Sequence, residues 1–235
     1  MKVFFPLAGE GKRFKNAGYT LPKPLLPLGN RRLIQLAIGS VSGIGCYYHY
    51  LPSMDLAFHK ELEGMLPPGC WHVIFAQTPG PLQTVLEAEK CLQDNEELLI
   101  MDCDSLRDSV ELNNAIQTFR LSGADGGVTV MKSNDPMCSY VEFNSEWWVS
   151  EAREKDPFTS WSSTGPYWFR TTSSFLEAAK KANNANHTSI NPVYNYLPGR
   201  TKAVPVSSFR HFGDPKAYEE ARSEYARLDN SSTTL

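Results

Sequence analysis

Short apolar runs alternate with amphipathic segments along the first half of the chain. Apolar or β-branched runs bounded by turn residues predict strands at Lys2–Leu7, Cys46–Leu51, Trp71–Ala76, Glu97–Met101 and Gly127–Met131. Apolar residues at three- and four-residue steps predict helices at Leu33–Val41, Met54–Met65, Leu82–Leu92 and Val110–Leu121. This order predicts an α/β fold with a mixed, mostly parallel sheet and helices on both faces.

The pattern changes in the second half. Short β-branched and aromatic runs predict strands at Ser139–Phe143, Trp147–Ala152, Gly165–Phe169 and near Ala203–Val206. Helical spacing recurs at Ser173–Ala182 and Pro215–Ala226. These elements suit a small antiparallel region at the edge of the sheet. We predict one domain over residues 1–235, with halves of about 1–132 and 133–228 and a frayed polar tail at 229–235.

Composition agrees with one compact domain and narrows the partners. The chain has 235 residues, of which 41% are hydrophobic, so it can bury a full core. Its net charge is −3, which supplies no general attraction for nucleic acid, so an anion site must be local. The five cysteines are scattered without a C-x-x-C pair, so a reducing cytoplasm is expected. No apolar run approaches a membrane span of roughly 20 residues, so no membrane association is expected.

A short glycine loop with cationic neighbours follows the first predicted strand. Gly9 and Gly11 allow the main chain to turn so that its N–H groups point at an anion. Lys12, Arg13 and Lys23 then supply positive charge, and Arg can grip two phosphate oxygens at once. The loop therefore favours a polyphosphate site. The alternative is a surface loop in which glycine and proline only make turns.

Two well-known phosphate loops do not match this segment. A Walker A loop needs a glycine where the chain has Pro6 and a Ser or Thr where it has Arg13. A dinucleotide-binding loop needs a third glycine where the chain has Phe14, and the helix that should start at once is displaced by a proline-rich loop.

Two carboxylates follow the fourth predicted strand. Asp102 and Asp104 are separated by one residue, so strand alternation sends both to the same side. Mg²⁺ is commonly bound by one or two carboxylates together with phosphate oxygens and water. The pair therefore predicts a magnesium site. The alternative is that Asp104 or Ser105 merely caps the helix that begins near Ser109.

The segments PLAGEGKRF and LPKPLLPL together resemble the signature of the nucleotidyltransferase family. The loop pattern A-G-Y-T-x-P-K-P is similar to that of the short members found in capsule and surface-polysaccharide biosynthesis. This resemblance implies a Rossmann-like sheet of the nucleotide-diphospho-sugar transferase type. It also implies that Leu7, Ala8, Gly9, Gly11 and Lys12 hold the nucleotide.

The resemblance assigns catalytic roles to three side chains. It implies that Arg13 holds the β- and γ-phosphates, that Lys23 approaches the α-phosphate and that Asp102 binds Mg²⁺. Relatives carry a second metal aspartate where this chain has His211. Asp104, Asp214 or water then completes the metal sphere, and His211 either donates to the phosphates or is an ordinary surface histidine.

The resemblance also points to base and acceptor contacts. A glutamine at the position of Gln77 contacts the base, and Gly80 belongs to the same nucleotide-binding loop, although Pro81 departs from the family pattern. Because an amide pairs with a pyrimidine edge, a pyrimidine nucleotide is expected. The resemblance also implies that residues of three segments contact the acceptor: Asp104, Glu154, Lys155, Gly165 and Tyr167. Lys155 is the first candidate for neutralising the acceptor phosphate, and Arg153 is the second.

The expected function is Mg²⁺-dependent transfer of a nucleoside monophosphate from an NTP to a phosphorylated small molecule. A sugar 1-phosphate is the first choice of acceptor, with release of pyrophosphate, for surface-polysaccharide precursor synthesis. Two alternatives stay open: a cytidylyltransferase that uses a small non-sugar phosphate, and a nucleotide-binding regulator without catalysis. A glycosyltransferase is disfavoured because it has no use for the triphosphate loop.

Overall fold

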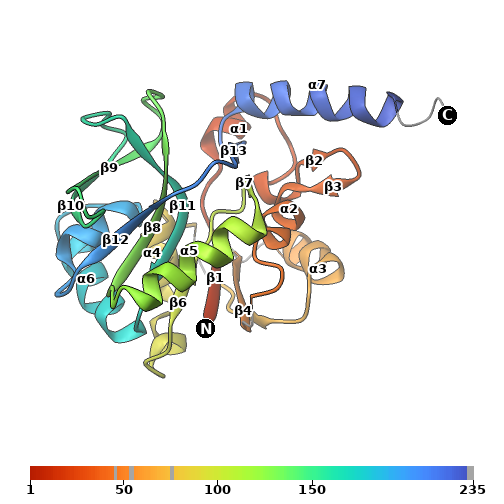
Figure 1. The fold of residues 1–235 in the computed structure, drawn as a ribbon. Coiled ribbons are helices and arrows are strands. Elements are labelled where there is room, and N and C mark those ends of the chain that lie inside the picture. The colour runs from red at the N-terminus through yellow and green to blue at the C-terminus, as the bar shows by residue number, and fades with distance from the viewer. Residues whose placement is uncertain (45–46, 53–55, 75–76, 232–235) are drawn as a thin grey trace.

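A mixed β-sheet forms the centre of the molecule (Figure 1). The computed structural model describes residues 1–44, 47–52, 56–74 and 77–231. Within these residues the main sheet has nine strands, seven of them in the order β10-β9-β11-β6-β1-β4-β5, while β8 pairs with β11 and β12.

The first half of the chain supplies the parallel strands. β1 (Lys2–Leu7) lies between β4 (Tyr47–Pro52) and β6 (Leu98–Ile100), and β5 (Cys70–Trp71) pairs with β4, all in parallel. The carboxyl ends of β1 and β6 therefore meet at the same edge, which is where ligands of α/β sheets bind.

The second half of the chain is largely antiparallel. Its central strand β11 runs antiparallel to β6, β8 and β9, and β10 continues the sheet beyond β9. Only β12 returns parallel, beside β8. The strands of this half are β8 (Gly126–Lys132), β9 (Ser139–Phe143), β10 (Val149–Glu154), β11 (Trp161–Phe169) and β12 (Thr201–Pro205).

Helices cover both faces of the sheet because the strands are apolar on both sides. Phe5 and Leu99 join the core under α2 (Leu33–Gly39), α3 (Leu56–Met65) and α5 (Ser109–Leu121). Phe4 and Ile100, which point the opposite way, join the second core. The elements over that face are α4 (Pro81–Glu87), η2 (Glu89–Leu92), α6 (Thr172–Asn184) and η3 (Asn191–Tyr196).

A third apolar cluster lies under the C-terminal helix, α7 (Pro215–Ser231), which runs along the top of the view in Figure 1. Buried Phe14, Leu28 and Leu33 pack there with Tyr218 and Ala221. The cluster joins α7 to three N-terminal elements, which are α1 (Lys12–Asn16), β2 (Pro27–Leu28) and α2. A short strand, β3 (Arg31–Arg32), pairs with β2. The end of the chain thus packs on the segment that surrounds the glycine loop.

A separate two-stranded ribbon connects distant parts of the sequence. β7 (Ser105–Arg107) pairs antiparallel with β13 (Phe209–His211). The main-chain N–H of Phe212 also donates to the Asp104 carbonyl at 2.7 Å. The ribbon therefore places His211 beside the aspartate loop.

The predicted fold class is confirmed, and Lys2–Leu7 and Ser139–Phe143 form strands with the predicted bounds. The prediction for Trp71–Ala76 is wrong in its length, since β5 ends at Trp71; residues 75–76 lie outside the described residues, as does Cys46. The predicted helix at Leu82–Leu92 divides at Ala88 into α4 and η2. The helix expected to be displaced after the glycine loop is present as the short α1.

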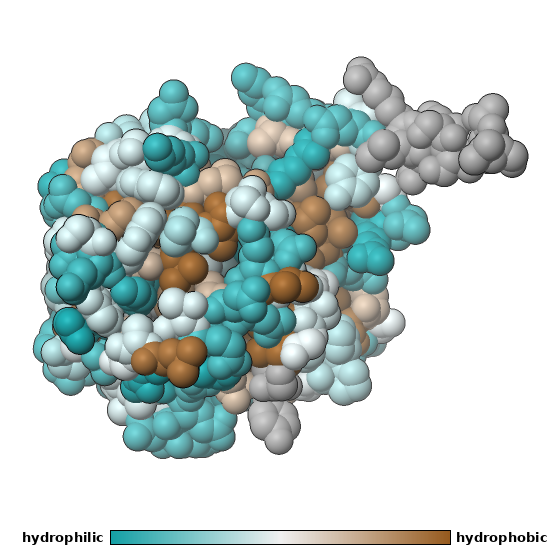
Figure 2. Space-filling view, viewed as in Figure 1, coloured by the Kyte–Doolittle hydropathy of each residue, from teal (hydrophilic) through white to brown (hydrophobic). Residues whose placement is uncertain are grey.

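The C-terminal helix extends into the predicted polar tail. α7 continues to Ser231, whereas the sequence predicts a frayed end from residue 229, and residues 232–235 lie outside the described residues. None of the described helices has the length and apolar character needed to cross a membrane. The face shown in Figure 2 is mostly hydrophilic, with hydrophobic side chains in several separate groups.

Candidate functional site

A cavity of about 340 Å³ opens at the carboxyl ends of β1 and β6. This volume lies at the lower end of the usual range for small-molecule sites. Its lining includes most of the predicted nucleotide and metal residues: Leu7, Gly9, Gly11, Lys23, Gln77, Gly80, Asp102 and Asp104. Segments that lie far apart in the sequence therefore meet at one site.

The glycine loop is held by a backbone contact with the loop after β5. Gly9 forms a β-bridge with Thr78, and the Thr78 N–H donates to the Ala8 carbonyl at 3.1 Å. Gly11 precedes α1 with a left-handed φ of 63°, a conformation that favours glycine. Ala8 itself is buried beneath the loop.

Lys23 and Asp104 form a buried ion pair at the cavity. Lys23 begins the short helix η1 (Lys23–Leu25), and its Nζ lies 2.8 Å from Asp104 Oδ2. Burial is the largest influence and disfavours the charged lysine, but the attraction of Asp104, Cys103 and Asp102 and the hydrogen bond to Asp104 together outweigh it and raise the pKa of Lys23. Burial likewise opposes ionised Asp104, yet Lys23 and then His211 hold the pKa of Asp104 well below its ordinary value. Asp104 is therefore ionised.

Asp102 has a different environment from Asp104. Its side chain is 32% exposed and lines the cavity, and its Oδ2 lies 3.9 Å from Arg107 Nη2. Burial, and next the Asp104 carboxylate, raise the pKa of Asp102 to about 7. The pKa values of these two carboxyl groups thus differ in direction, because the Lys23 ammonium contacts Asp104 directly at 2.8 Å whereas the Arg107 guanidinium lies 3.9 Å from Asp102.

His211 lies beside Asp104, as the ribbon requires. A Cβ added to Gly213 would lie 2.7 Å from Asp104 Oδ2 and would overlap the His211 ring, so the three residues share one small space. Asp214 has a structural role instead, because its Oδ1 accepts from the Ala217 N–H at 3.0 Å at the start of α7. His211 thus shares the space beside Asp104, while the Asp214 carboxylate is engaged at the start of α7.

Lys12 and Arg13 are exposed on α1 and do not line the cavity. Lys12 Nζ pairs with Glu10 at 2.7 Å, and the Lys12 side chain is 76% exposed. Gln77 is exposed at the cavity, where a base could reach its amide. Gly80 lies against the Thr188 carbonyl so closely that any side chain there would overlap it, which explains the glycine.

Two of the predicted acceptor residues, Gly165 and Tyr167, lie on β11, which runs antiparallel to β6, the strand that precedes Asp102. Glu154 and Lys155 lie at the end of β10. Gly165 on β11 has a φ of 90°, and a Cβ there would overlap Asp102 Oδ2. Tyr167 is buried, and burial, followed by the charges of Asp102 and Glu154, raises its pKa well above the ordinary value. Lys155 follows β10, with its Nζ 3.7 Å from Glu154 Oε1.

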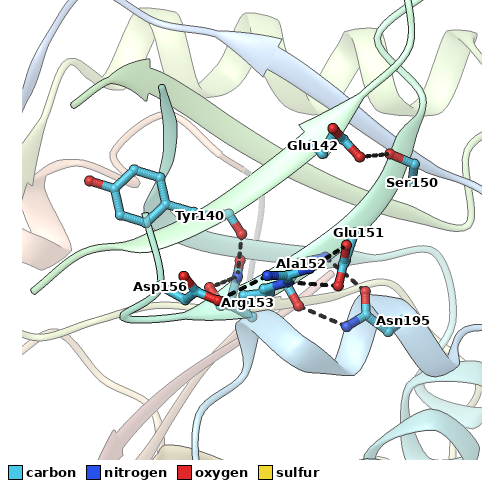
Figure 3. A network of polar contacts seen from close by, with 9 residues as sticks. Tyr140, Glu142, Ser150, Glu151, Ala152, Arg153, Asp156 and Asn195 are labelled. Carbon is cyan, nitrogen blue, oxygen red and sulfur yellow. Dashed lines mark hydrogen bonds and ion pairs between the residues drawn. The ribbon is translucent and has the colours of Figure 1, made fainter. Parts of the chain in front are cut away.

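Figure 3 shows how the strand that carries Glu154 is anchored. Asn195 on η3 exchanges two hydrogen bonds with the main chain of Ala152, at 2.8 and 2.7 Å. Arg153, the second choice for binding the acceptor phosphate, already pairs with Glu151 at 2.7 Å and with Asp156 at 3.0 Å. Its charge is therefore balanced locally, which favours Lys155 for that role.

The donor set fits a magnesium ion that is shared with a substrate. In the described part of the chain no three His, Cys, Asp or Glu side chains are grouped as a metal cage. Asp102 presents its carboxylate to the cavity, while Asp104 is already bonded to Lys23. Mg²⁺ is usually held by one or two carboxylates and by substrate phosphates rather than by a full protein cage. Asp102 suits that arrangement.

Three residues at the site are not among the site residues predicted from the sequence. Tyr19 and Phe14 line the cavity, and Arg107 lies behind Asp102. Tyr19 belongs to the recognised loop pattern, so its position could have been anticipated. Arg107 could have been found only by reading Ser105–Arg107 as a strand with alternate residues on one side.

A Rossmann-like sheet whose strand ends bring together a glycine loop, a lysine and two aspartates defines a nucleotide-binding α/β protein. A family model described as "Nucleotidyl transferase" matches residues 7–227, and the chain belongs to that family.

Curated relatives match part of the chain. A mannose-1-phosphate guanyltransferase of Aspergillus fumigatus is 28% identical over 145 residues, which make up 58% of this chain and 39% of that protein. The enzyme of the same name from Aspergillus oryzae is 27% identical over the same length. The matched part thus spans well under half of these relatives.

Solved structures share the fold over nearly the whole chain. A nucleoside-diphosphate-sugar pyrophosphorylase from Vibrio cholerae superposes with a TM-score of 0.78 at 19% identity, over 94% of this chain and 99% of that one. A UDP-glucose pyrophosphorylase complexed with UDP-glucose gives 0.76 at 19% identity, over 97% and 98% of the two chains. These similarities establish the fold.

Proposed function

We propose that the protein transfers a nucleoside monophosphate from an NTP to a phosphorylated acceptor, a sugar 1-phosphate, and releases pyrophosphate. The observation that supports this best is the convergence of the glycine loop, Lys23 and Asp102 on one cavity. The names of relatives and fold neighbours, a mannose-1-phosphate guanyltransferase and sugar-nucleotide pyrophosphorylases, favour a sugar phosphate as acceptor.

The reaction needs alignment and charge neutralisation more than acid–base chemistry. An oxygen of the acceptor phosphate attacks the α-phosphorus in line, and pyrophosphate leaves from the opposite side. Main-chain N–H groups of the loop from Gly9 to Gly11 bind the leaving phosphates. Lys23 donates to the α-phosphate, where negative charge is redistributed during the attack.

The remaining residues orient the two substrates. Arg13 reaches the β- and γ-phosphates from α1, and Lys155 neutralises the acceptor phosphate. Gln77 reads the base, and a pyrimidine suits its amide. Asp102 would hold the Mg²⁺ that comes with the nucleotide, and the cation would neutralise phosphate charge when bound.

The biological setting follows from the product. A sugar nucleotide is an activated sugar donor, and the resemblance of the loop to the capsule and surface-polysaccharide branch favours use in surface-polysaccharide synthesis. A supply of NTP and the scattered cysteines favour the cytoplasm.

Pyrophosphate release is the direct test. The purified protein is assayed with Mg²⁺, each common NTP, and sugar 1-phosphates or small phosphorylated alcohols as acceptors. We expect release only when an NTP and an acceptor are both present, with loss of release in Asp102→Asn. A preference for phosphorylated alcohols would support the cytidylyltransferase alternative. Nucleotide binding without release on any acceptor would support the non-catalytic alternative and overturn the proposal.

A further inference from the structure

Arg107 is a buried cation behind Asp102 and Asp104. Its side chain is 4% exposed, and it does not line the cavity. Its Nε donates to the Thr164 carbonyl at 2.8 Å, and its Nη2 donates to the same carbonyl and to Ser105 Oγ, the latter at 2.7 Å. The guanidinium lies 5.4 Å from the centre of the Phe209 ring. Arg107 therefore binds main chain and side chains of the protein, not a substrate.

The carbonyl that Arg107 binds belongs to an irregular part of β11. Ser163 pairs with Val130 of β8, and Tyr167 pairs with Val128. An advance of four residues along β11 therefore corresponds to an advance of only two residues along β8. The ladder is thus interrupted between these residues, as in a β-bulge. Such an interruption leaves main-chain groups without ladder partners, and the guanidinium supplies the partner for Thr164.

The interruption brings Gly165 against the aspartate. Gly165 has a φ of 90°, and a Cβ there would lie 2.6 Å from Arg107 Nη2 and closer still to Asp102 Oδ2. Arg107 Nη2 is itself 3.9 Å from Asp102 Oδ2. One guanidinium therefore contacts the bulge of β11 and faces the Asp102 carboxylate.

We propose that Arg107 is a positioning residue that holds the Thr164–Gly165 bulge of β11 in register with Asp102. This inference rests on the proposed function, in which Asp102 serves the nucleotide and β11 serves the acceptor. Fixing the two relative to each other aligns the acceptor phosphate with the α-phosphorus. A misplacement of about 1 Å can slow such a reaction on the order of a hundredfold.

Lysine cannot reproduce this arrangement. Arg107 uses two nitrogens on one carbonyl and one of them also on Ser105, which requires a planar fork. A lysine side chain at this position would carry the same charge on a single nitrogen. The substitution Arg107→Lys therefore separates the geometry of the fork from its charge.

Arg170 provides a matched control on the residue after the same strand. Its Nε donates to the Ala124 carbonyl at 2.6 Å, and its guanidinium lies 5.6 Å from the Trp168 ring centre. Like Arg107, it ties the main chain together and packs near an aromatic ring. It lies at the end of β11 away from the bulge, because Trp168 and Phe169 separate it from Tyr167.

The test compares Arg107→Lys and Arg107→Met with Arg170→Lys in the full chain. Hydrogen exchange is measured for peptides covering residues 161–169, with nucleotide affinity and the acceptor KM and kcat. For Arg107→Lys we expect exchange at the bulge to accelerate by about tenfold or more. We expect acceptor KM to rise and kcat to fall, each by about tenfold, with nucleotide affinity within about twofold of wild type. Arg170→Lys should keep both kinetic constants.

Each outcome decides a separate question. Unchanged exchange at the bulge in Arg107→Lys, or equal kinetic losses in Arg170→Lys, would overturn the positioning role. If Arg107→Met folds, hydrogen exchange at the bulge should accelerate in it as well. If Arg107→Met does not fold, the Arg107→Lys variant alone decides the question. A wild-type protein that transfers nothing would overturn the proposed function, while the exchange measurement would still show whether Arg107 holds the bulge.

Discussion

The ammonium group of Lys23 lies 2.8 Å from Asp104 Oδ2, so a loop after β1 and a loop after β6 are joined by one ion pair at the cavity. The side chains are 26% and 7% exposed, respectively, so the pair is largely withdrawn from water. Breaking a buried pair by removing one partner costs more than the pair contributes, because the other charge is left uncompensated.

Lys23→Ala should therefore lose both activity and stability. We expect kcat to fall roughly a hundredfold or more, as for one lost transition-state donor. The free energy of unfolding should fall by about 3 kcal/mol, as when a buried pair is broken. Denaturation of Lys23→Ala and of the double variant with Asp104→Asn checks the cause, since the second change should recover part of the stability. Exposed Lys216→Ala serves as the control. Wild-type turnover in Lys23→Ala would exclude its catalytic role.

Gly165→Ala should disrupt the site through its methyl group. The new Cβ would overlap Asp102 Oδ2, and φ at this position is 90°. Gly123 offers a matched control, because it has a φ of 72° with no atom within 4 Å of an added Cβ. Gly123→Ala should cost about 1 kcal/mol of backbone strain and keep its activity. Gly165→Ala should lose more stability and, on the order of a hundredfold, activity. Equal behaviour of the two variants in thermal denaturation and turnover would show that the contact with Asp102 is unimportant.

Tyr19 ties the cavity loop to the C-terminal helix. Its hydroxyl donates to Glu219 on α7, and its ring lies 5.7 Å from that of Tyr218. Removing the hydroxyl in Tyr19→Phe should cost about 1 kcal/mol, the usual net value of one hydrogen bond. Because Tyr19 lines the cavity, we also expect the nucleotide KM to rise several-fold.

Tyr218→Phe is the control for that change. The Tyr218 hydroxyl donates to the Pro27 carbonyl at 2.6 Å, and Tyr218 does not line the cavity. We expect a similar loss of stability with an unchanged nucleotide KM. If the two variants raise KM equally, the effect comes from α7 as a whole and not from the Tyr19 contact.

Acid should destabilise the protein through His49. His49 Nδ1 lies 2.9 Å from His72 Nε2, and burial, followed by His72 and Lys2, lowers the pKa of His49 to about 4. The unfolded chain takes up this proton near pH 6.5, whereas the folded chain does so only near pH 4, so stability falls as the pH drops between these values. The slope is at most about 1.4 kcal/mol per pH unit for one histidine.

Chemical denaturation at several pH values measures this slope. His49→Gln should flatten the curve between pH 4 and pH 6.5, relative to wild type. The pKa of His72 is also lowered by burial, so some slope should persist in the single variant. An identical pH dependence of the two proteins would contradict the assignment to His49.

The sequence predicts those parts of the fold that depend on local pattern. The apolar run Lys2–Leu7 is buried on both faces, and this is the typical pattern of a central parallel strand. The spacing of Asp102 and Asp104 at a strand end predicts that both face the same side, and both line the cavity. The pairing of Asp104 with Lys23 has no local signal, because 81 residues separate them.

The β7–β13 ribbon shows why other contacts escape prediction. Ser105–Arg107 and Phe209–His211 are too short and too polar to carry a strand pattern, and they pair across about half the chain. α1 escapes prediction for another reason, since Lys12–Asn16 is only one turn of helix and begins at a left-handed glycine. The ribbon thus depends on pairing between distant segments, and α1 depends on the left-handed φ of Gly11. Neither is encoded in the periodicity of apolar residues.

The ribbon also has a consequence for the order in which the protein is made. Synthesis proceeds from the N-terminus, so Phe212 and Tyr218 emerge from the ribosome long after Phe14 and Asp104. Until they do, the Asp104 carbonyl lacks its Phe212 partner and the apolar side chains around Phe14 lack their cover. The nascent chain therefore cannot complete its site until β13 and α7 have been synthesised, long after its glycine loop has emerged.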